Sequence, residues 1–201
     1  MDVSKDGRYL VATNRQGRIF VWANWTASDP VSQMMPAVRQ SVETLAFAPD
    51  NITFATGNNE HTIRIWQIRA NGEQVSEIRT LSSHQGAVKA LTYSPNGSML
   101  GSVSDDQTIQ IRHLNTSEGY DKKPNILEDH LGTVWDLDFS PNNRRFATGS
   151  DDETVRIWIS DPQELVDGIC ERLPGKQLSN EEWDTFIGDD FEIGPFQKPC
   201  P

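Results

Sequence analysis

Long apolar segments are missing from this 201-residue sequence, and cysteine is scarce. No run of about 18 apolar residues occurs, so the sequence offers no membrane-spanning helix. The first ten residues, MDVSKDGRYL, include acidic side chains and no apolar core, which is not the pattern of a secretory signal. The only two cysteines are Cys170 and Cys200. We therefore expect a cytoplasmic protein whose two thiols are reduced rather than bridged.

Basic residues are also few. The chain has 18 Lys and Arg against 29 Asp and Glu, a formal net charge of -11. Residues 1–160 account for -4 and residues 161–201 for -7. An acidic surface repels phosphate backbones, so nucleic acid is disfavoured as a partner. The simplest interpretation of the charge is a solvated surface that keeps the protein soluble.

The common signatures of catalysis and cofactor binding are absent. The sequence contains no glycine-rich phosphate loop and no nucleophile elbow. The neighbouring carboxylates Asp151, Asp152 and Glu153 do not have the spacing of a calcium loop. His61 and His113 are most simply surface residues at strand ends. We expect no catalytic residue, no metal ligand and no cofactor, and the protein is not predicted to be an enzyme.

What the sequence does contain is a repeat. The segment FATGSDDETVRIW (146–158) has counterparts in TFATGNNEHTIRIW (53–66) and MLGSVSDDQTIQIR (99–112), spaced by 46 residues, and a weaker one in YLVATNRQGRIFVW (9–22). Each copy follows a short apolar segment that closes in a Pro or Gly turn, as in YSPNG (93–97). Self-similarity at roughly 40 to 45 residues with strand-type content is typical of a propeller array.

One repeat is predicted to form a small antiparallel sheet. In the third copy, residues 87–93 read as an apolar strand, 98–104 as a second strand and 108–112 as a third, with polar turns between them. A weaker outer strand is expected at 125–129. A sheet of this size cannot bury both of its faces, so neighbouring repeats must stack.

These motifs resemble the WD-repeat β-propeller family. The resemblance rests on the elements SP-x-G, S-x-D-x-T-[IV]-x-[IV]-W and H-x-G-x-V, and it covers residues 1–160. It implies an all-β, partial propeller of about four blades, at 1–35, 36–81, 82–127 and 128–160, followed by a short α-helical tail at 161–201. In the family, seven or eight repeats usually close a ring, which generally serves as a protein-binding platform and not as an enzyme.

The resemblance also implies a structural hydrogen-bond network in each repeat. A His before the innermost strand, a Ser or Thr on the second strand, an Asp in the tight turn and a Trp on the third strand are its members. Carried over, these are His130, Thr148, Asp152 and Trp158 in the fourth copy, His84, Ser102 and Asp106 in the third, and Thr56 and Trp66 in the second. The same residue types occur in catalytic triads, but this set recurs along the chain and ends on an apolar Trp. We therefore interpret it as a brace of the sheet.

The copies depart from this pattern increasingly toward the N-terminus. The third has Arg112 in place of Trp, and this side chain is expected either to turn outward or to pair with an acid. The second has Glu60 for Asp and Val38 for His, and the first keeps only Trp22. The bracing is thus expected to weaken from the C-terminal copy to the N-terminal copy.

A partner surface is expected where the innermost strands begin. Glu43, Lys89 and Trp135 hold equivalent positions there, each directly after a repeated valine. Varied side chains on a repeated frame suit recognition, and Trp is a favoured interface anchor. The alternative is that Trp135 fills the central channel.

The tail has helical character. Residues 160–173 and 179–188 have capping residues and apolar spacing of two short helices, which would be marginal alone and are expected to dock on the sheet. The stretch CERLPGKQLSNEEWDTFIG (170–188) resembles the segment after the last repeat in bacterial multidomain signalling proteins. The resemblance implies a non-catalytic scaffold or sensor, the C-terminal part of such a protein. The alternative is a regulatory subunit or a propeller that binds a small ligand in its channel.

Four incomplete blades do not make a ring of seven or eight. Val3 aligns with Phe47, so the first innermost strand is short, and the last repeat has no fourth strand before residue 161. Three arrangements follow: further blades in a longer chain, two copies that complete a larger ring by self-association, or an open half-ring that the tail caps. An open array exposes apolar faces, which favours association.

Overall fold

The described part of the chain is all-β, as predicted. The computed structural model describes residues 1–14, 16–28, 31–34, 41–69, 74–82, 84–115, 119–120 and 123–160, and no helix occurs among them. None of these residues belongs to a helix long and apolar enough to cross a membrane. The two helices expected within 160–188 and the proposed docking of the tail fall on residues 161–201, which lie outside the described part.

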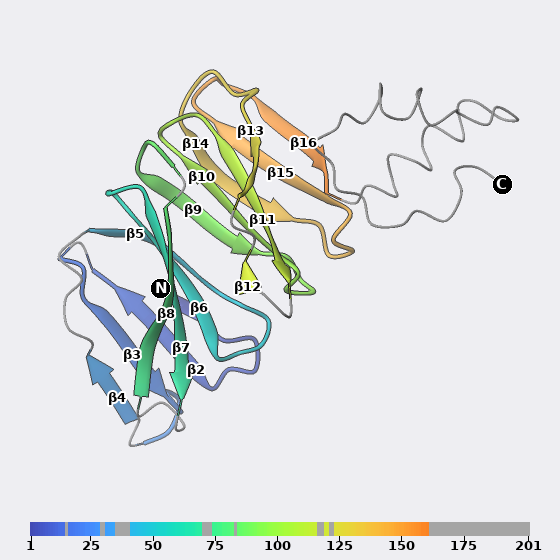
Figure 1. Cartoon of the computed structure of the whole chain (residues 1–201). Helices are drawn as coiled ribbons and strands as arrows, with labels where there is room; N and C mark the ends of the chain where they lie inside the picture. The colour runs from blue at the N-terminus through green and yellow to red at the C-terminus, as the bar shows by residue number, and fades with distance from the viewer. Residues whose placement is uncertain are drawn as a thin grey trace, which may run out of the picture. The chain divides into compact units, whose positions relative to one another are not determined.

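The strands form four antiparallel sheets, one after another along the chain (Figure 1). The first sheet contains β1 (Asp2–Val3), β2 (Tyr9–Thr13), β3 (Ile19–Ala23) and β4 (Val31–Met34). The second contains β5 (Val42–Phe47), β6 (Thr53–Asn58), β7 (Thr62–Arg69) and β8 (Gln74–Ser82). The third contains β9 (Val88–Tyr93), β10 (Met99–Ser104), β11 (Ile109–Asn115), β12 (Gly119–Tyr120) and β13 (Asn125–Leu127). The fourth contains β14 (Val134–Phe139), β15 (Arg145–Ser150) and β16 (Val155–Ile159).

Neighbouring sheets stack through their first strands. Within the compact unit Met1–Ile157, β1 lies against β5, β5 against β9, and β9 against β14. Strand order in the first, second and fourth sheets follows chain order, whereas in the third both β12 and β13 pair with β11. The expected outer strand at 125–129 is thus present as Asn125–Leu127.

The core lies between the sheets, because each sheet has two apolar faces. Every residue of β6 and of β10 is buried, which is the pattern of a strand covered on both sides. The cluster between the first and second sheets contains Tyr9, Val11, Ile19, Val21, Ala23, Phe54, Trp66 and Ile68. The cluster between the second and third sheets contains Ala46, Ala48, Ala55, Ile63, Ile65, Leu81, Val88, Leu91, Tyr93, Leu100 and Tyr120. Packing between sheets therefore holds the array together.

The turn after each first strand requires a left-handed backbone, and the sequence supplies residues that adopt it. Gly7, Asn51, Gly97 and Asn143 hold equivalent positions, with φ between 60° and 74°. The two asparagines have a second role, since the backbone N–H of Asp6 donates to the Asn51 Oδ1 and that of Asn96 to the Asn143 Oδ1, each at 2.9 Å. These bonds join the first sheet to the second and the third to the fourth.

Arg112, which replaces the tryptophan of the third repeat, does not turn outward. It lies on β11 opposite Leu100 and is only 3% exposed. The repeat therefore accommodates a guanidinium in the interior of the sheet.

Candidate functional site

The histidine of the fourth repeat is held by the residues that the sequence indicated. The His130 side chain is fully buried, with its Nδ1 2.7 Å from the Asp152 Oδ2 and its Nε2 2.8 Å from the Thr148 Oγ1. Hydrogen bonds from the Thr154 hydroxyl, then from His130 and the Leu131 N–H, hold the pKa of Asp152 well below its usual range, although burial pushes it upward. Trp158, the fourth residue of the expected network, lies on β16.

The third repeat builds the same arrangement. The His84 Nδ1 lies 3.1 Å from the Asp106 Oδ2, and its Nε2 lies 2.8 Å from the Ser102 Oγ. Burial acts to raise the pKa of Asp106, but the hydrogen bonds from His84, the Gln85 N–H and Thr108 outweigh it and lower this pKa well below its usual range. The carboxylate thus stays charged and anchors the loop before β9 to the β10–β11 turn.

Close backbone approach explains the glycine in the H-x-G element. A Cβ at Gly86 would lie 2.6 Å from the Asp106 backbone N, and one at Gly132 would lie 2.9 Å from the Asp152 backbone N. Real Cβ atoms do not approach this closely. Glycine therefore lets the histidine loop lie directly on the aspartate turn.

The second repeat keeps only part of the network. The Trp66 indole N–H donates to the Thr56 Oγ1 at 2.9 Å. Its turn is held instead by Asn58, whose Oδ1 accepts the backbone N–H groups of Glu60 and Thr62. Position 38, where the pattern places His, lies outside the described residues.

This network has no geometry for nucleophilic catalysis. Both histidine side chains are fully buried, and both hydroxyls that face them are on buried residues. A nucleophile must be exposed beside oxyanion donors to reach a substrate. The arrangement provides buried polar groups with partners, which is a structural task.

The three residues expected to bind a partner share a feature that the sequence did not reveal. In the pairing of β5 with β6, Val42 lies opposite Asn58 and Thr44 opposite Gly57, so Glu43 is skipped. Lys89 is skipped in the same way between β9 and β10, and Trp135 between β14 and β15. Each is therefore the extra residue of a β-bulge, a device that redirects a side chain and often lies near functional sites.

Two of these bulge residues contact each other across neighbouring sheets. The Lys89 Nζ lies 5.2 Å from the centroid of the Trp135 ring, in a cation–π contact, and 2.9 Å from the Asp105 Oδ2. The Trp135 indole N–H donates to the Asp151 Oδ1 at 2.7 Å, yet the residue remains 51% exposed. The Trp135 ring is thus held in one orientation while much of it faces solvent.

We call Glu43, Lys89, Asp105, Trp135 and Asp151 the bulge surface. Glu43 is exposed and accepts a hydrogen bond from the Ser41 hydroxyl at 2.9 Å. Asp105 and Asp151 were not predicted from the sequence as partner residues. Their equivalent positions, in the β10–β11 turn and the β15–β16 turn, could have indicated them. The surface combines three carboxylates, one ammonium and one exposed indole, so its net charge is negative.

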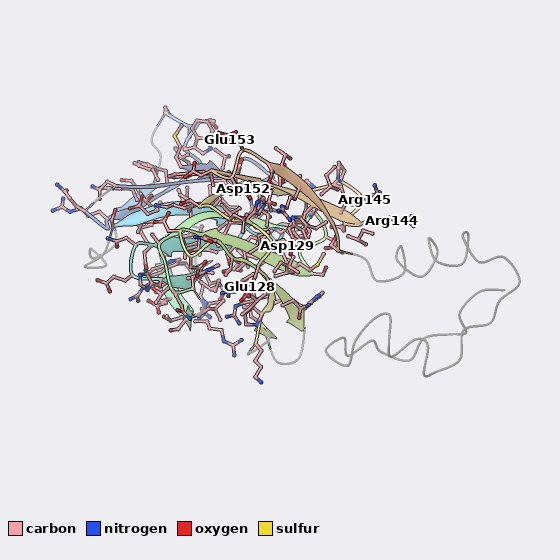
Figure 2. The ribbon with its side chains drawn as sticks, turned by 90° about the horizontal axis from the view of Figure 1, so that it is seen from above. Glu128, Asp129, Arg144, Arg145, Asp152 and Glu153 are labelled. Carbon is pink, nitrogen blue, oxygen red and sulfur yellow. The ribbon has the colours of Figure 1, made fainter. Side chains whose placement is uncertain are left out.

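The fourth sheet is oppositely charged at its two ends. Figure 2 shows Asp152 and Glu153 together at one end, in the β15–β16 turn, and Arg144 and Arg145 at the other, at the start of β15. Asp151 belongs to the same turn as Asp152, so the bulge surface lies at the acidic end of this sheet.

Comparison with known proteins identifies the repeat. The model of the family described as WD domain, G-beta repeat matches residues 33–67, 75–112 and 121–158. These three matches cover more than half of the chain, and they do not include the weaker first copy, which nevertheless forms a four-stranded sheet. No curated protein matches the sequence. The repeated sheets, their histidine–aspartate turns and this match together show that the chain belongs to the WD domain, G-beta repeat family.

Proposed function

We propose that this chain is a non-catalytic protein-interaction scaffold or sensor module that binds its partner through the bulge surface. Repeats of this family generally mediate protein–protein interaction, and their proteins are generally non-catalytic. The observation that carries the choice of surface is Trp135, a half-exposed indole on a β-bulge, oriented by Asp151 and Lys89. A rigid aromatic side chain loses little entropy on binding and is a favoured anchor.

The charges around Trp135 indicate the chemistry of the partner. Asp151 accepts the indole N–H, Asp105 pairs with the Lys89 that lies over the ring, and Glu43 adds a further carboxylate on the second sheet. A partner segment with an apolar side chain to pack on the indole and a Lys or Arg beside it fits this surface best. Because rim charges steer encounter, association should slow as ionic strength rises.

The experiment is capture of partners by the immobilised full chain, with Trp135→Ala compared to Trp25→Ala. Trp25 is a matched control, since it is 39% exposed and its indole N–H also has an acceptor, the Gly7 carbonyl at 3.1 Å. Loss of a central aromatic anchor weakens binding by about thirtyfold or more, whereas the control retains its partner. Equal capture by Trp135→Ala and wild type, with both folded by circular dichroism, would refute the proposal.

The cellular context belongs to the same proposal. The resemblance of residues 170–188 to the segment after the last repeat in bacterial multidomain signalling proteins supports a role as the C-terminal part of a bacterial-type signalling protein. Retention of a small molecule, and no protein, on the immobilised chain would favour instead a regulatory or ligand-binding role.

A further inference from the structure

Two apolar side chains on the outer face of the fourth sheet are not covered by any described residue, unlike their counterparts in the other three sheets. Val155 is 75% exposed and Ile157 is 70% exposed. The residues at the position of Val155 are Ile19, Ile63 and Ile109, and those at the position of Ile157 are Val21, Ile65 and Ile111. All six are at most 5% exposed, and the four in the first and second sheets belong to the clusters formed with the next sheet. The repeat has therefore built a packing face here that nothing among the described residues covers.

A pair of glycines shows the same difference in space. A Cβ at Gly57, on the second sheet, would lie 2.6 Å from the Val88 Cγ1 of the next sheet. Gly149 holds the same repeat position in the fourth sheet, and a Cβ there would meet nothing within 4 Å. The space that the next sheet fills beside Gly57 is therefore open beside Gly149.

The complementary face is present at the other end of the array. Phe54 and Trp66 of the second sheet pack on the Ile19 and Val21 side of the first sheet. In the first sheet, Leu10 and Trp22 hold the positions of Phe54 and Trp66, and they lie opposite each other in the pairing of β2 with β3. Phe54 and Trp66 are 0% and 4% exposed, whereas Leu10 and Trp22 are only partly buried. The first sheet therefore carries the apolar face that fits the outer face of the fourth.

A polar contact repeats in the same register. At the junction of the first and second sheets, the Asp2 Oδ1 accepts the N–H of Val3, and its Oδ2 accepts the N–H of Phe47 at 2.9 Å. Asp138 holds the position of Asp2 in the fourth sheet, and its Oδ1 accepts the N–H of Phe139 in the same way. Asp138 is exposed. It thus offers its Oδ2 to the N–H of an incoming strand. Val3 of a second copy holds the position of Phe47, and its N–H would exchange the local bond to its own Asp2 Oδ1 for the bond to Asp138.

From these features we infer that the outer face of the fourth sheet binds the first sheet of a second copy of this chain. The junction repeats the one between the first and second sheets: Val155 and Ile157 pack against Leu10 and Trp22 of the second copy, and Asp138 accepts the N–H of Val3. The contact joins two different faces, so it is head-to-tail rather than symmetric. This association does not depend on the bulge surface, and the two proposals fail separately.

The experiment measures the solution mass of the full chain by light scattering over a range of concentrations, with two interface variants and one control. Ile157→Asp places a charge on the fourth-sheet face, and Leu10→Asp does so on the first-sheet face. Ile126→Asp is the control, because Ile126 is an apolar strand residue of similar accessibility, 49% exposed, on β13. Circular dichroism establishes that each variant is folded.

Wild type and the control are expected to associate. For each interface variant, the concentration at which half of the chains are dissociated is expected to be about a hundredfold higher than for wild type. The head-to-tail geometry makes one further demand. A mixture of Ile157→Asp and Leu10→Asp regains a single intact junction, so it forms a dimer that neither variant forms alone. Should Leu10→Asp prove unfolded, Asp138→Ala, which is exposed and outside the core, tests the same junction by weakening the wild-type association.

Three outcomes would overturn the inference. A wild-type chain that stays monomeric at every concentration has this face covered by its own residues 161–201 or left bare. A Leu10→Asp variant that is folded and still dimeric means that two fourth-sheet faces meet each other. A mixture of the two folded variants that remains monomeric means that the two faces are not complementary.

Discussion

Replacement of Asp106 by Ala gives the sharpest test of the brace between loop and turn. The Asp106 side chain is 11% exposed and accepts hydrogen bonds from the His84 ring, the Gln85 N–H at 2.7 Å and the Thr108 hydroxyl at 2.7 Å. Its removal leaves the Nδ1 of the fully buried His84 ring with only the Thr108 Oγ1, 3.1 Å away, as a partner, and each unsatisfied buried group costs about 1 to 3 kcal/mol. Water can replace the acceptor only at Gln85, which is exposed.

We expect Asp106→Ala to lower the free energy of unfolding by about 3 kcal/mol, which corresponds to a fall in Tm of about 6 to 12 °C for a protein of this size. The measurement is thermal and urea unfolding followed by circular dichroism. The neighbouring Asp105 is the control, since its side chain is 40% exposed and its ion pair with Lys89 is worth at most about 1 kcal/mol. Equal stability losses in the two alanine variants would show that the carboxylate of Asp106 is not a brace.

The remaining predictions concern pH, the tyrosine pair and the packing of neighbouring sheets. The pKa of Asp106 is lowered in the folded state, so this residue stabilises the protein above its unfolded pKa of about 3.9. The stabilisation is lost as pH falls toward the folded pKa. The stability difference between wild type and Asp106→Ala, measured by urea unfolding, should therefore shrink below about pH 4. Tyr120→Phe leaves the buried Tyr93 hydroxyl without its partner at 2.6 Å and should lower the free energy of unfolding by about 1 to 2 kcal/mol. The double variant, with Phe at positions 93 and 120, should regain part of this loss. An additive loss in the double variant would contradict the prediction. Gly57→Ala should lower the free energy of unfolding by about 1 to 3 kcal/mol, because the added Cβ meets Val88. Gly149→Ala should be nearly neutral in dilute protein. Thermal melts that do not separate the two variants would count against the stacking of the sheets.

Much of the fold follows from the repeat itself. The apolar spacing of residues 87–93 and 98–104 predicted β9 and β10, and the polar turn at residues 105–107 predicted the reversal before β11. These signals are local, because strand and turn propensities depend on residues close in the chain. The short strand β12 was missed, since two residues give no periodicity, and Tyr120 is defined by its bond to Tyr93, 27 residues away.

The candidate site was predicted only in part. Alignment of the repeats placed Glu43, Lys89 and Trp135 at one position, but the bulges that project them depend on pairing with the next strand and leave no mark in a single segment. Likewise, nothing local indicates that Lys89 of one sheet lies over Trp135 of the next. Arg112 is a third example, because its burial at a tryptophan position is decided by the packing around it.

The alternation of Gly7, Asn51, Gly97 and Asn143 along the array has a consequence for how such chains can be lengthened or shortened. Asn51 and Asn143 each clamp the sheet before them, whereas Gly97 instead leaves room for the Pro49 ring, 3.5 Å from where its Cβ would stand. Deleting the third repeat alone would set Asn143 against Asp50, which holds the position of Asp6, and would keep both clamps. Deleting the second alone would set Gly97 against Asp6 and leave only one. The repeats of this protein are therefore not equally exchangeable, and a chain without the third repeat should melt higher than a chain without the second.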